Sequence, residues 1–497
     1  MKIILFVFMI FISFQSFAQT DLYKEQYRPR FHFSPAKNWC NDPNGLVYNN
    51  GVYHLFYQHN PFGNVWGHMT WAHATSKDLI HWKHQPIAIA EENGIMIFSG
   101  TCVIDKNNST GFAKKKGQVP MVAIYTGHIE NVNQSQNIAY SLDNGITWTK
   151  YEGNPILDLH KKDFRDPKVF WYEPKKYWVM ALMFPNEHYV QFYSSKNLKK
   201  WNHLSDFGPA GDTNAVWECP DLTQVPVEGG GRKMKWLLQT SQNASMQYFV
   251  GEFDGVKFIS ENPPDKIVRP DYGPDYYAAI CYNQLPTSHA PTAIGWLNNW
   301  NYANEIPTTP WKGAMSIPRN LGVKKINGEW ELIQQPDKRI FSLRDKLIGS
   351  WGNIVLSGEK QLNTKTQQCE IILTIEPASN SIAGIKLAAG NNHPFEIGYD
   401  ATKQLLYIDR SKTANQTEND NFKKLSHFET KLALHNNQLK LHIFFDNSIV
   451  EIFANDGEAV MTAQIFPGKM DNAIQLFSEG GKAKMNINAW SMKSGWQ

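Results

Sequence analysis

Short runs of apolar and polar residues, with little helical periodicity, dominate the chain from about residue 30 to residue 320. Tyr53–Tyr57, Met121–Tyr125, Tyr177–Leu182 and Trp236–Gln239 are rich in aromatic and β-branched side chains, and Gly, Asn, Asp and Pro separate such runs. We find no long amphipathic helical pattern among them. The pattern therefore predicts an all-β domain built from many short strands.

A short motif recurs within this region. Ser76–Trp82, Ser141–Trp148 and Ser195–Trp201 each follow a predicted strand and form a polar turn that ends in Trp. Coincidence among turn residues is the alternative explanation. Repeats that each carry a few strands are typical of the blades of a β-propeller. We therefore expect a propeller, although the repeat alone does not give the number of blades.

The pattern changes after about residue 322, where a polar stretch is followed by strands that alternate more regularly. Leu439–Ile443 and Ile449–Phe453 flank a polar hairpin turn, and Asn455–Gly457 supplies another. Such strands are typical of an antiparallel β-sandwich, which we expect to be mainly structural. The predicted organisation is a signal peptide over 1–18, a propeller over 28–325, a linker over 326–344 and a β-sandwich over 345–497.

The N-terminus has the pattern of a secretory signal peptide. Lys2 precedes the apolar run Ile3–Phe14, and the small residues of Ser16–Ala18 follow, so we expect cleavage near Ala18. A membrane anchor is the alternative, but the run is short for a bilayer span. We therefore expect a secreted or periplasmic protein without a membrane span.

Composition narrows the function classes. Hydrophobic residues make up 42% of the 497 positions and charged residues 19%, which is enough for packed cores in two domains. A net charge of +3 without a long basic run argues against a nucleic-acid partner. The five cysteines are scattered and form no CxxC pair, so neither a disulfide scaffold nor a zinc-thiolate site is predicted. One disulfide remains possible.

Three carboxylates stand in short motifs that place a Pro close behind the acid. Asp42 lies in Asn-Asp-Pro-Asn-Gly, Asp166 in Arg-Asp-Pro and Glu218 in Trp-Glu-Cys-Pro. Each motif alone could be an ordinary turn or strand end. In a propeller, however, the innermost strands converge on the axis, so acids far apart in sequence can meet. Glycoside hydrolysis needs such a pair, one as acid and one as nucleophile or base.

Together these motifs resemble glycoside hydrolase family 32, which includes invertases, levanases and inulinases. Further segments similar to the family occur throughout the mature chain, and the similarity extends into the predicted sandwich. The additional segments are Tyr53–Gln58, Trp66–Trp71, Phe98–Gly100, Gln247–Gly251, Asp275–Ala278, Trp296–Trp300, Met315–Arg319 and Val450–Gly457.

The resemblance implies a five-bladed β-propeller followed by a C-terminal β-sandwich. It also implies that Asp42 is the nucleophile, Glu218 the general acid/base and Asp166 the stabiliser of the transition state. A departure from the family is Cys40, where a larger apolar residue is usual. Trp296 and Trp311 compete with Trp300 for a place in the fructose pocket. The residues implied to bind fructose are Asn41, Gln58, Trp66, Ser99, Arg165 and Trp300.

Other candidate chemistry is weaker. Histidines at positions 54, 59, 68, 73, 81 and 84 cluster in sequence, but their spacing follows strands and loops, and no His-Glu-x-x-His motif occurs. We therefore expect no metal and no cofactor.

The leading hypothesis is a retaining, exo-acting β-fructosidase that releases terminal fructose from levan or inulin and from sucrose. A dedicated invertase and a fructosyltransferase, which would use the same residues, are alternatives. A catalytically silent fructan-binding propeller is an alternative of another class, although Asp42, Asp166 and Glu218 are all present. The sequence predicts neither the oligomeric state nor the preferred linkage.

Overall fold

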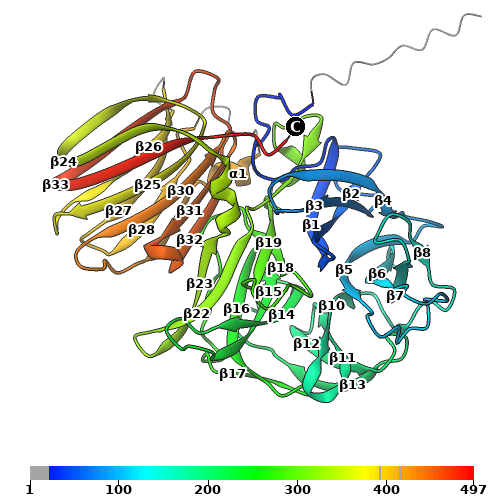
Figure 1. The fold of residues 1–497 in the computed structure, drawn as a ribbon. Helices are drawn as coiled ribbons and strands as arrows, with labels where there is room; N and C mark the ends of the chain where they lie inside the picture. Colours follow the sequence, from blue (N-terminus) through cyan, green and yellow to red (C-terminus); the bar gives the residue numbers. More distant parts are fainter. Residues whose placement is uncertain (1–21, 391–392, 414–416, 418, 497) are drawn as a thin grey trace, which may run out of the picture.

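The structure is a computed structural model that describes residues 22–390, 393–413, 417 and 419–496. The expected signal peptide over 1–18 lies outside this part of the chain. Two all-β domains lie side by side, with the N-terminal domain forming a ring of five small sheets (Figure 1). This confirms the predicted five-bladed propeller and the sandwich that follows it. In the described residues, no helix has the length and apolar character needed to cross a membrane.

Each blade of the propeller is an antiparallel sheet whose first strand is the innermost. The first three blades contain β1 (Asn38–Asn49), β2 (Val52–Asn60), β3 (Thr70–Ser76) and β4 (Trp82–Ile89); β5 (Met96–Ile104), β6 (Met121–Ile129), β7 (Asn133–Ser141), β8 (Thr149–Lys150) and β9 (Leu157–Lys161); and β10 (Arg165–Tyr172), β11 (Tyr177–Phe184), β12 (Tyr189–Ser195) and β13 (Asn202–Phe207). A short 3-10 helix, η1 (Glu173–Lys175), joins β10 to β11.

The last two blades complete the ring. They contain β14 (Glu218–Pro226), β15 (Met234–Gln242), β16 (Ser245–Phe253) and β17 (Phe258–Ser260); and β18 (Tyr277–Cys281), β19 (Thr292–Leu297), β21 (Ala314–Met315), β22 (Arg319–Ile326) and β23 (Glu329–Pro336). Between β19 and β21 lie η2 (Ala303–Glu305) and β20 (Trp311–Lys312). Because β20 pairs in parallel with the start of β1, the fifth blade is tied to the first.

The repeated motif occupies one equivalent position in three blades. Ser76–Trp82, Ser141–Trp148 and Ser195–Trp201 each begin at the last residue of a blade's third strand and lead into its fourth. In each turn an Asp or Asn side chain accepts hydrogen bonds from backbone N–H groups two to four residues ahead, as short polar side chains do in turns. These side chains are Asp78, Asp143 and Asn197.

The C-terminal domain is a sandwich of antiparallel strands around one apolar core, which includes Leu373, Ile443 and Ile487. Its long last strand joins the two layers, because it pairs with β24, β25 and β26. The strands are β24 (Arg344–Lys365), β25 (Gln368–Pro377), β26 (Ile382–Ala389), β27 (Phe395–Asp400), β28 (Leu405–Asp409), β29 (His427–Lys431), β30 (Leu439–Asp446), β31 (Ile449–Ala454), β32 (Ala459–Gln464) and β33 (Ala473–Met492), and the short helices are α1 (Asp420–Lys424) and η4 (Asn455–Gly457).

The segment that joins the domains is shorter than the 326–344 expected from sequence. β23 (Glu329–Pro336) pairs with β22 along its whole length and so completes the fifth blade. Only η3 (Lys338–Leu343) then separates the propeller from β24, which begins at Arg344. Glu329–Pro336 has the polar character of a linker because this edge strand is partly exposed.

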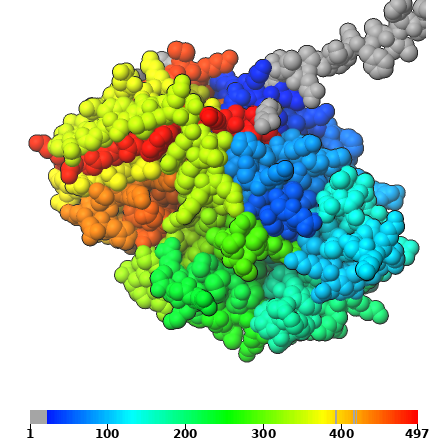
Figure 2. All heavy atoms as spheres, viewed as in Figure 1, coloured from blue at the N-terminus to red at the C-terminus, as the bar shows by residue number. Residues whose placement is uncertain are grey.

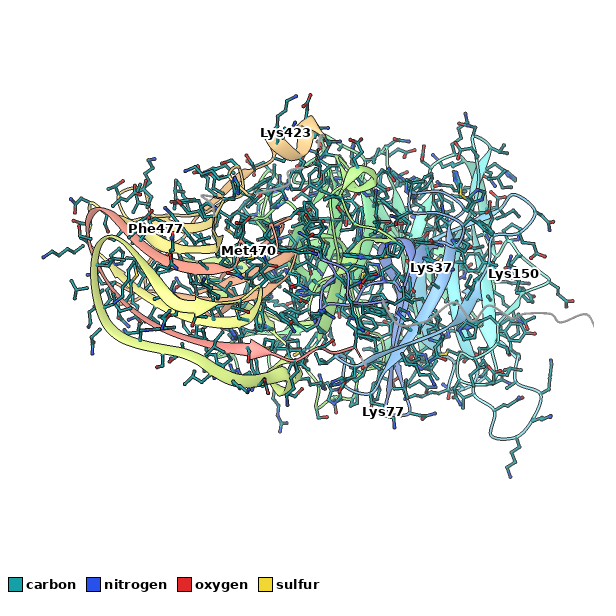
Figure 3. All side chains as sticks on the ribbon, turned by 90° about the horizontal axis from the view of Figure 1, so that it is seen from above. Lys37, Lys77, Lys150, Lys423, Met470 and Phe477 are labelled. Carbon is teal, nitrogen blue, oxygen red and sulfur yellow. The ribbon has the colours of Figure 1, made fainter. Side chains whose placement is uncertain are left out.

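Buried charges join the two domains, which pack against each other without an open gap in the space-filling view (Figure 2). Arg319 of β22 binds Glu451 of the sandwich and Asp271 of the propeller. The ring of His32 lies between Asp446 and Glu451, at 2.8 and 2.9 Å. Seen from above, the sandwich and the propeller form the two halves of an elongated molecule (Figure 3).

Candidate active site

The first residues of the five innermost strands share one irregularity. In each strand the pairing with the neighbouring strand shifts register, as at a β-bulge, and such bulges redirect side chains next to active sites. Asp166, Cys219 and Ala278 have positive φ angles at these shifts. At the start of each innermost strand, the side chains therefore do not alternate regularly between the two faces of the sheet. All five of these strand starts lie at the same end of the ring. The shifts fall at Cys40/Pro43, Ile97/Gly100, Arg165/Lys168, Glu218/Asp221 and Tyr277/Ile280.

All nine residues singled out in the sequence line one pocket at this end of the propeller. The pocket has a volume of about 230 Å³. Two apolar side chains, Met69 and Phe98, complete its wall. The structure thus brings together residues from four blades and the loop after β19. The nine are Asn41, Asp42, Gln58, Trp66, Ser99, Arg165, Asp166, Glu218 and Trp300.

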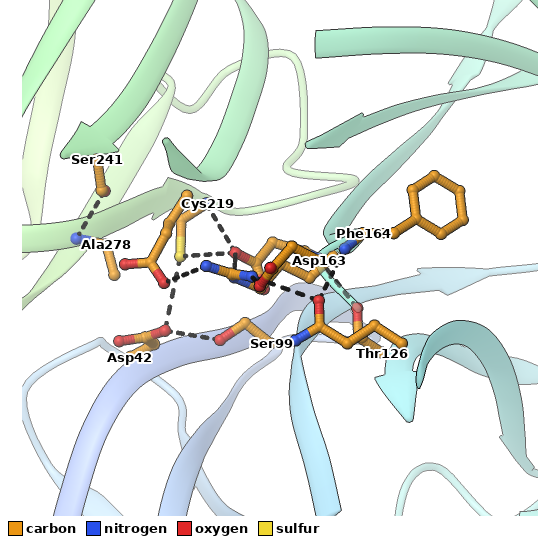
Figure 4. A network of polar contacts seen from close by, with 12 residues as sticks. Asp42, Ser99, Thr126, Asp163, Phe164, Cys219, Ser241 and Ala278 are labelled. Atoms are coloured by element: carbon orange, nitrogen blue, oxygen red, sulfur yellow. Dashed lines mark hydrogen bonds and ion pairs between the residues drawn. The ribbon is translucent and has the colours of Figure 1, made fainter. Parts of the chain in front are cut away.

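Asp42 is buried and surrounded by hydrogen-bond donors (Figure 4). Ser99 Oγ donates to its Oδ2 at 2.7 Å, and Asn41 Nδ2 donates to its Oδ1 at 3.0 Å. Cys219 Sγ lies 3.5 Å from Oδ2. Burial raises the pKa of Asp42, as does the Glu218 charge, while these donors lower it. The donors therefore stabilise the ionised form that a nucleophile needs.

The sulfur of Cys219 lies between the carboxylates of Asp166 and Asp42. The Cys219 backbone N–H donates to Asp166 Oδ2 at 3.0 Å, and the Cys219 Sγ is 3.7 Å from the same oxygen. Burial raises the pKa of Asp166, Arg165 opposes this rise, and the Glu218 charge adds to it. A buried carboxylate in this position can accept hydrogen bonds from sugar hydroxyl groups.

Glu218 is the most accessible of the three acids. Its side chain is 25% exposed, against 6% for Asp166. Arg165 Nη2 donates to its Oε1 at 3.2 Å, and the Tyr277 hydroxyl donates to its Oε2 at 2.5 Å. Both oxygens are thus held in place on the more accessible side of the pocket.

Two tryptophans, Trp66 and Trp300, form part of the pocket wall. Trp66 is 38% exposed, and its backbone N–H donates to Asn304 Oδ1 at 3.0 Å. Trp300 lines the pocket, whereas Trp296 is fully buried behind it with the ring centroids 4.7 Å apart. Trp311 is also buried and lies under the Arg28 guanidinium. Of the three candidates, the structure therefore places Trp300 in the pocket.

Cys219 and Tyr277 contact the three acids but are not among the residues predicted from the sequence. Both were present in the quoted motifs, Trp-Glu-Cys-Pro and Asp-Tyr-Tyr-Ala, but side-chain direction at a bulge cannot be read from a period of two. Cys40, the departure from the family pattern, is buried in the core of the first blade, with its sulfur next to Gly313. It does not line the pocket.

The histidines of residues 54–84 are spread over separate environments. His54 and His73 hydrogen-bond to each other at 3.1 Å in a blade core, and His68 binds Glu91 at the surface. Throughout the described ranges, no group of three or more His, Cys, Asp or Glu side chains is arranged to hold a metal ion.

Comparison with known families matches both domains. Residues 32–336 match the N-terminal domain of glycosyl hydrolases family 32, and residues 340–491 match the C-terminal domain of that family. The chain belongs to glycoside hydrolase family 32. The two matches meet at the short segment around η3, in agreement with the domain boundary in the structure.

Several members of family 32 are similar to this protein over nearly the whole of its chain. A levanase of Bacillus subtilis is 41% identical over 99% of this chain and 74% of its own length. An extracellular exo-inulinase of Aspergillus niger is 38% identical over 95% of this chain and 96% of its own. The crystal structure of an exo-inulinase from Aspergillus awamori superposes with a TM-score of 0.91, at 37% identity, covering 95% of this chain and 100% of that one. A fructofuranosidase from Schwanniomyces occidentalis, in complex with fructose, has a TM-score of 0.85 at 31% identity and covers 95% and 99% of the two chains.

Proposed function

We propose that this protein is a retaining, exo-acting β-fructosidase that releases terminal fructose from fructans and sucrose. The observation that carries the proposal is the gathering of Asp42, Asp166 and Glu218 in one pocket of about 230 Å³. Family 32 relatives named levanase, exo-inulinase and fructofuranosidase support the substrate class.

In the first step, the Asp42 carboxylate attacks the anomeric carbon of the terminal fructose. Glu218 transfers its proton to the glycosidic oxygen, so the bond to the rest of the substrate breaks and the leaving group departs neutral. Asp42 accepts donors from Ser99 and Asn41, which hold its attacking oxygens in one orientation. The product of this step is a covalent fructosyl ester on Asp42.

In the second step, Glu218 acts as a base. It removes a proton from a water molecule, whose oxygen attacks the anomeric carbon, and the ester bond to Asp42 breaks. Fructose leaves with its configuration retained, Asp42 is again a carboxylate and Glu218 is again protonated. Asp166 and Asp42 favour the cationic character of both transition states because they place negative charge beside the sugar.

The floor of the pocket supports attack at chain ends only. Beneath the acids, Lys168 Nζ pairs with Asp221 at 2.5 Å and donates to Cys281 O at 2.8 Å. Farther along the axis, Asn283 Nδ2 donates to Thr101 and to two backbone carbonyl oxygens. Because these buried groups fill the axis, the pocket is closed below and a fructan cannot thread through the ring. Residues from four blades enclose the pocket of about 230 Å³, so an internal unit, which carries chain on both sides, would clash with its wall.

The N-terminus supports a proposal for the location of the protein. The apolar run and small residues before Ala18 support export, as does the relative named an extracellular exo-inulinase. The proposal is therefore that the mature enzyme acts outside the cytoplasm, on fructan or sucrose there.

The test is fructose release from sucrose, inulin and levan by the purified mature chain and by Asp42→Ala. We expect release from all three substrates and a loss of about 10³-fold or more in the variant. Glu252→Ala, which removes a surface carboxylate that pairs with Lys235, is the matched control and should keep full activity. Near-normal turnover by a folded Asp42→Ala protein would contradict the proposal.

A further inference from the structure

A second and larger cavity lies at the opposite end of the propeller axis. It is lined by the last residues of the innermost strands, such as Trp171 of β10, whereas Asp166 of the same strand lies in the active site. Five residues of strand separate the two, which corresponds to roughly 16 Å. The buried groups around Lys168 and Asn283 fill the axis between them. The two cavities therefore open separately, on opposite faces of the ring.

The volume of this distal cavity is about 850 Å³, several times that of the active-site pocket. Cavities of this size commonly hold small ligands. The distal cavity therefore has room for a ligand larger than the single fructose unit proposed for the active-site pocket. Its size alone does not identify a ligand, which must come from the side chains that line it.

Aromatic rings form one wall of the distal cavity. The rings of Trp171 and Trp178 meet edge to face at 5.2 Å, and Phe170 lies 5.5 Å from Trp236. Phe170 and Trp171 are only partly buried. Ring faces that remain open to a cavity offer flat apolar surfaces, against which the C–H faces of sugar rings can pack.

Neutral polar groups supply much of the rest of the lining. Amides and hydroxyls come from Asn107, Thr223, Gln224, Gln284 and Thr287, and the charged side chains are one Lys and one Glu. Burial lowers the pKa of His289, so this residue is neutral near pH 7. The net charge of the lining is therefore close to zero, which disfavours phosphorylated or carboxylated ligands.

From these features we infer that the distal cavity is a second, non-catalytic binding site for a neutral fructo-oligosaccharide. The aromatic wall packs against the sugar rings, and the amides and hydroxyls bind their hydroxyl groups. This binding role is separate from hydrolysis. The distal cavity would hold the enzyme on its polymer while the active site removes terminal units. Its ligand class rests on the proposed function.

The test is calorimetric titration of the Asp42→Ala protein with nystose, a neutral oligosaccharide that this variant cannot consume. We expect two binding events. Adding Trp171→Ala should weaken one of them by about tenfold or more and leave the other unchanged. Trp171→Phe, which keeps an aromatic face, should retain both events.

The matched control is Trp330→Ala in the same background. Trp330 is partly exposed outside the distal cavity and donates from its Nε1 to Glu261 at 2.6 Å, just as Trp171 donates to Glu173 at 2.6 Å. It should leave both events unchanged. A single event in the Asp42→Ala protein, or two events that Trp171→Ala does not alter, would overturn the inference.

Fructose release from sucrose, measured in parallel with Asp42 intact, separates this inference from the proposed function. Trp171→Ala should hydrolyse sucrose at the unmodified rate, because the changed side chain is far from the acids. Hydrolysis together with a single binding event would refute the second site alone. Two binding events without hydrolysis would refute the proposed function and leave the second site supported.

Discussion

Arg410 of the sandwich donates from Nη1 to Oδ2 of Asp275 in the propeller, at a distance of 2.9 Å. The Tyr302 hydroxyl accepts from Arg410 Nη2 and donates to Asp275 Oδ1, both at 2.8 Å. All three side chains are buried. Asp275 precedes Tyr277 by two residues, and Tyr277 binds Glu218. The sandwich therefore anchors the segment that holds Glu218, one of the proposed catalytic acids.

Replacing Arg410 by Met should destabilise the protein by about 3–5 kcal/mol, because Asp275 would be left as a buried charge without its partner. Lys403→Met is the control. Lys403 is an exposed sandwich residue that pairs with Asp400, and such surface pairs contribute little. Denaturant unfolding measures both. An Arg410→Met protein as stable as the control would show that this contact is not needed to join the domains.

The second interdomain contact predicts a dependence of stability on pH. Burial alone would lower the pKa of His32, but its hydrogen bonds to Asp446 and Glu451 raise the pKa to about 9. The folded-state pKa thus lies above the unfolded value of about 6.5. The stabilisation, up to about 3 kcal/mol, is complete below pH 6.5 and is lost as pH rises to about 9.

Unfolding free energies measured between pH 6 and 10 test this prediction. His32→Gln should be less stable at pH 6 and should lack most of the decline. His203→Gln changes an exposed histidine that pairs with Asp206 and should leave the curve unaltered. A His32→Gln curve parallel to that of the unmodified protein would contradict the assignment.

Tyr277→Phe isolates the hydroxyl that binds Glu218 while keeping the ring. Loss of this donor leaves Glu218 Oε2 without the contact that fixes its position. We therefore expect a lower kcat/KM, by about tenfold. Tyr172→Phe, in the third blade, is a control that should keep the unmodified kcat/KM. An unchanged kcat/KM in Tyr277→Phe would leave Tyr277 with a packing role only.

The role of Glu218 as an acid can be separated from a binding role by the choice of substrate. An aryl fructoside has a good leaving group that needs little protonation. Glu218→Ala should therefore lose much less activity on the aryl fructoside than on sucrose, in the step that forms the fructosyl enzyme. Pre-steady-state release of the aryl group measures that step directly. Equal losses on both substrates would count against general-acid catalysis.

The pocket residues could be predicted through the resemblance to family 32, whose short motifs include the strand starts that carry Asp42, Asp166 and Glu218. Asp42, Asp166 and Glu218 could be recognised together even though more than 170 residues separate the first from the last. Tyr277 and Cys219 escaped because contacts at a bulge depend on backbone angles, such as the positive φ of Cys219. The distal cavity could not be predicted, since it forms only when the ends of separate strands meet.

The domain boundary shows a second limit. β23 alternates weakly and lies at the edge of its sheet, so its residues resemble a linker until their pairing partner in β22 is known. The interdomain charges were also invisible in sequence. Arg319 and Glu451 are 132 positions apart, and they form an ion pair only because one domain packs on the other.

The proposed exo mode requires that the pocket, which Lys168 and Asp221 close at its floor, takes in a terminal fructose but not an internal one. Chromatography of inulin and levan digests in the first minutes tests it most directly. The account predicts free fructose as the only small product from the earliest sample, while the polymer shortens gradually. A ladder of fructo-oligosaccharides that appears before fructose would show cleavage within the chain and contradict it.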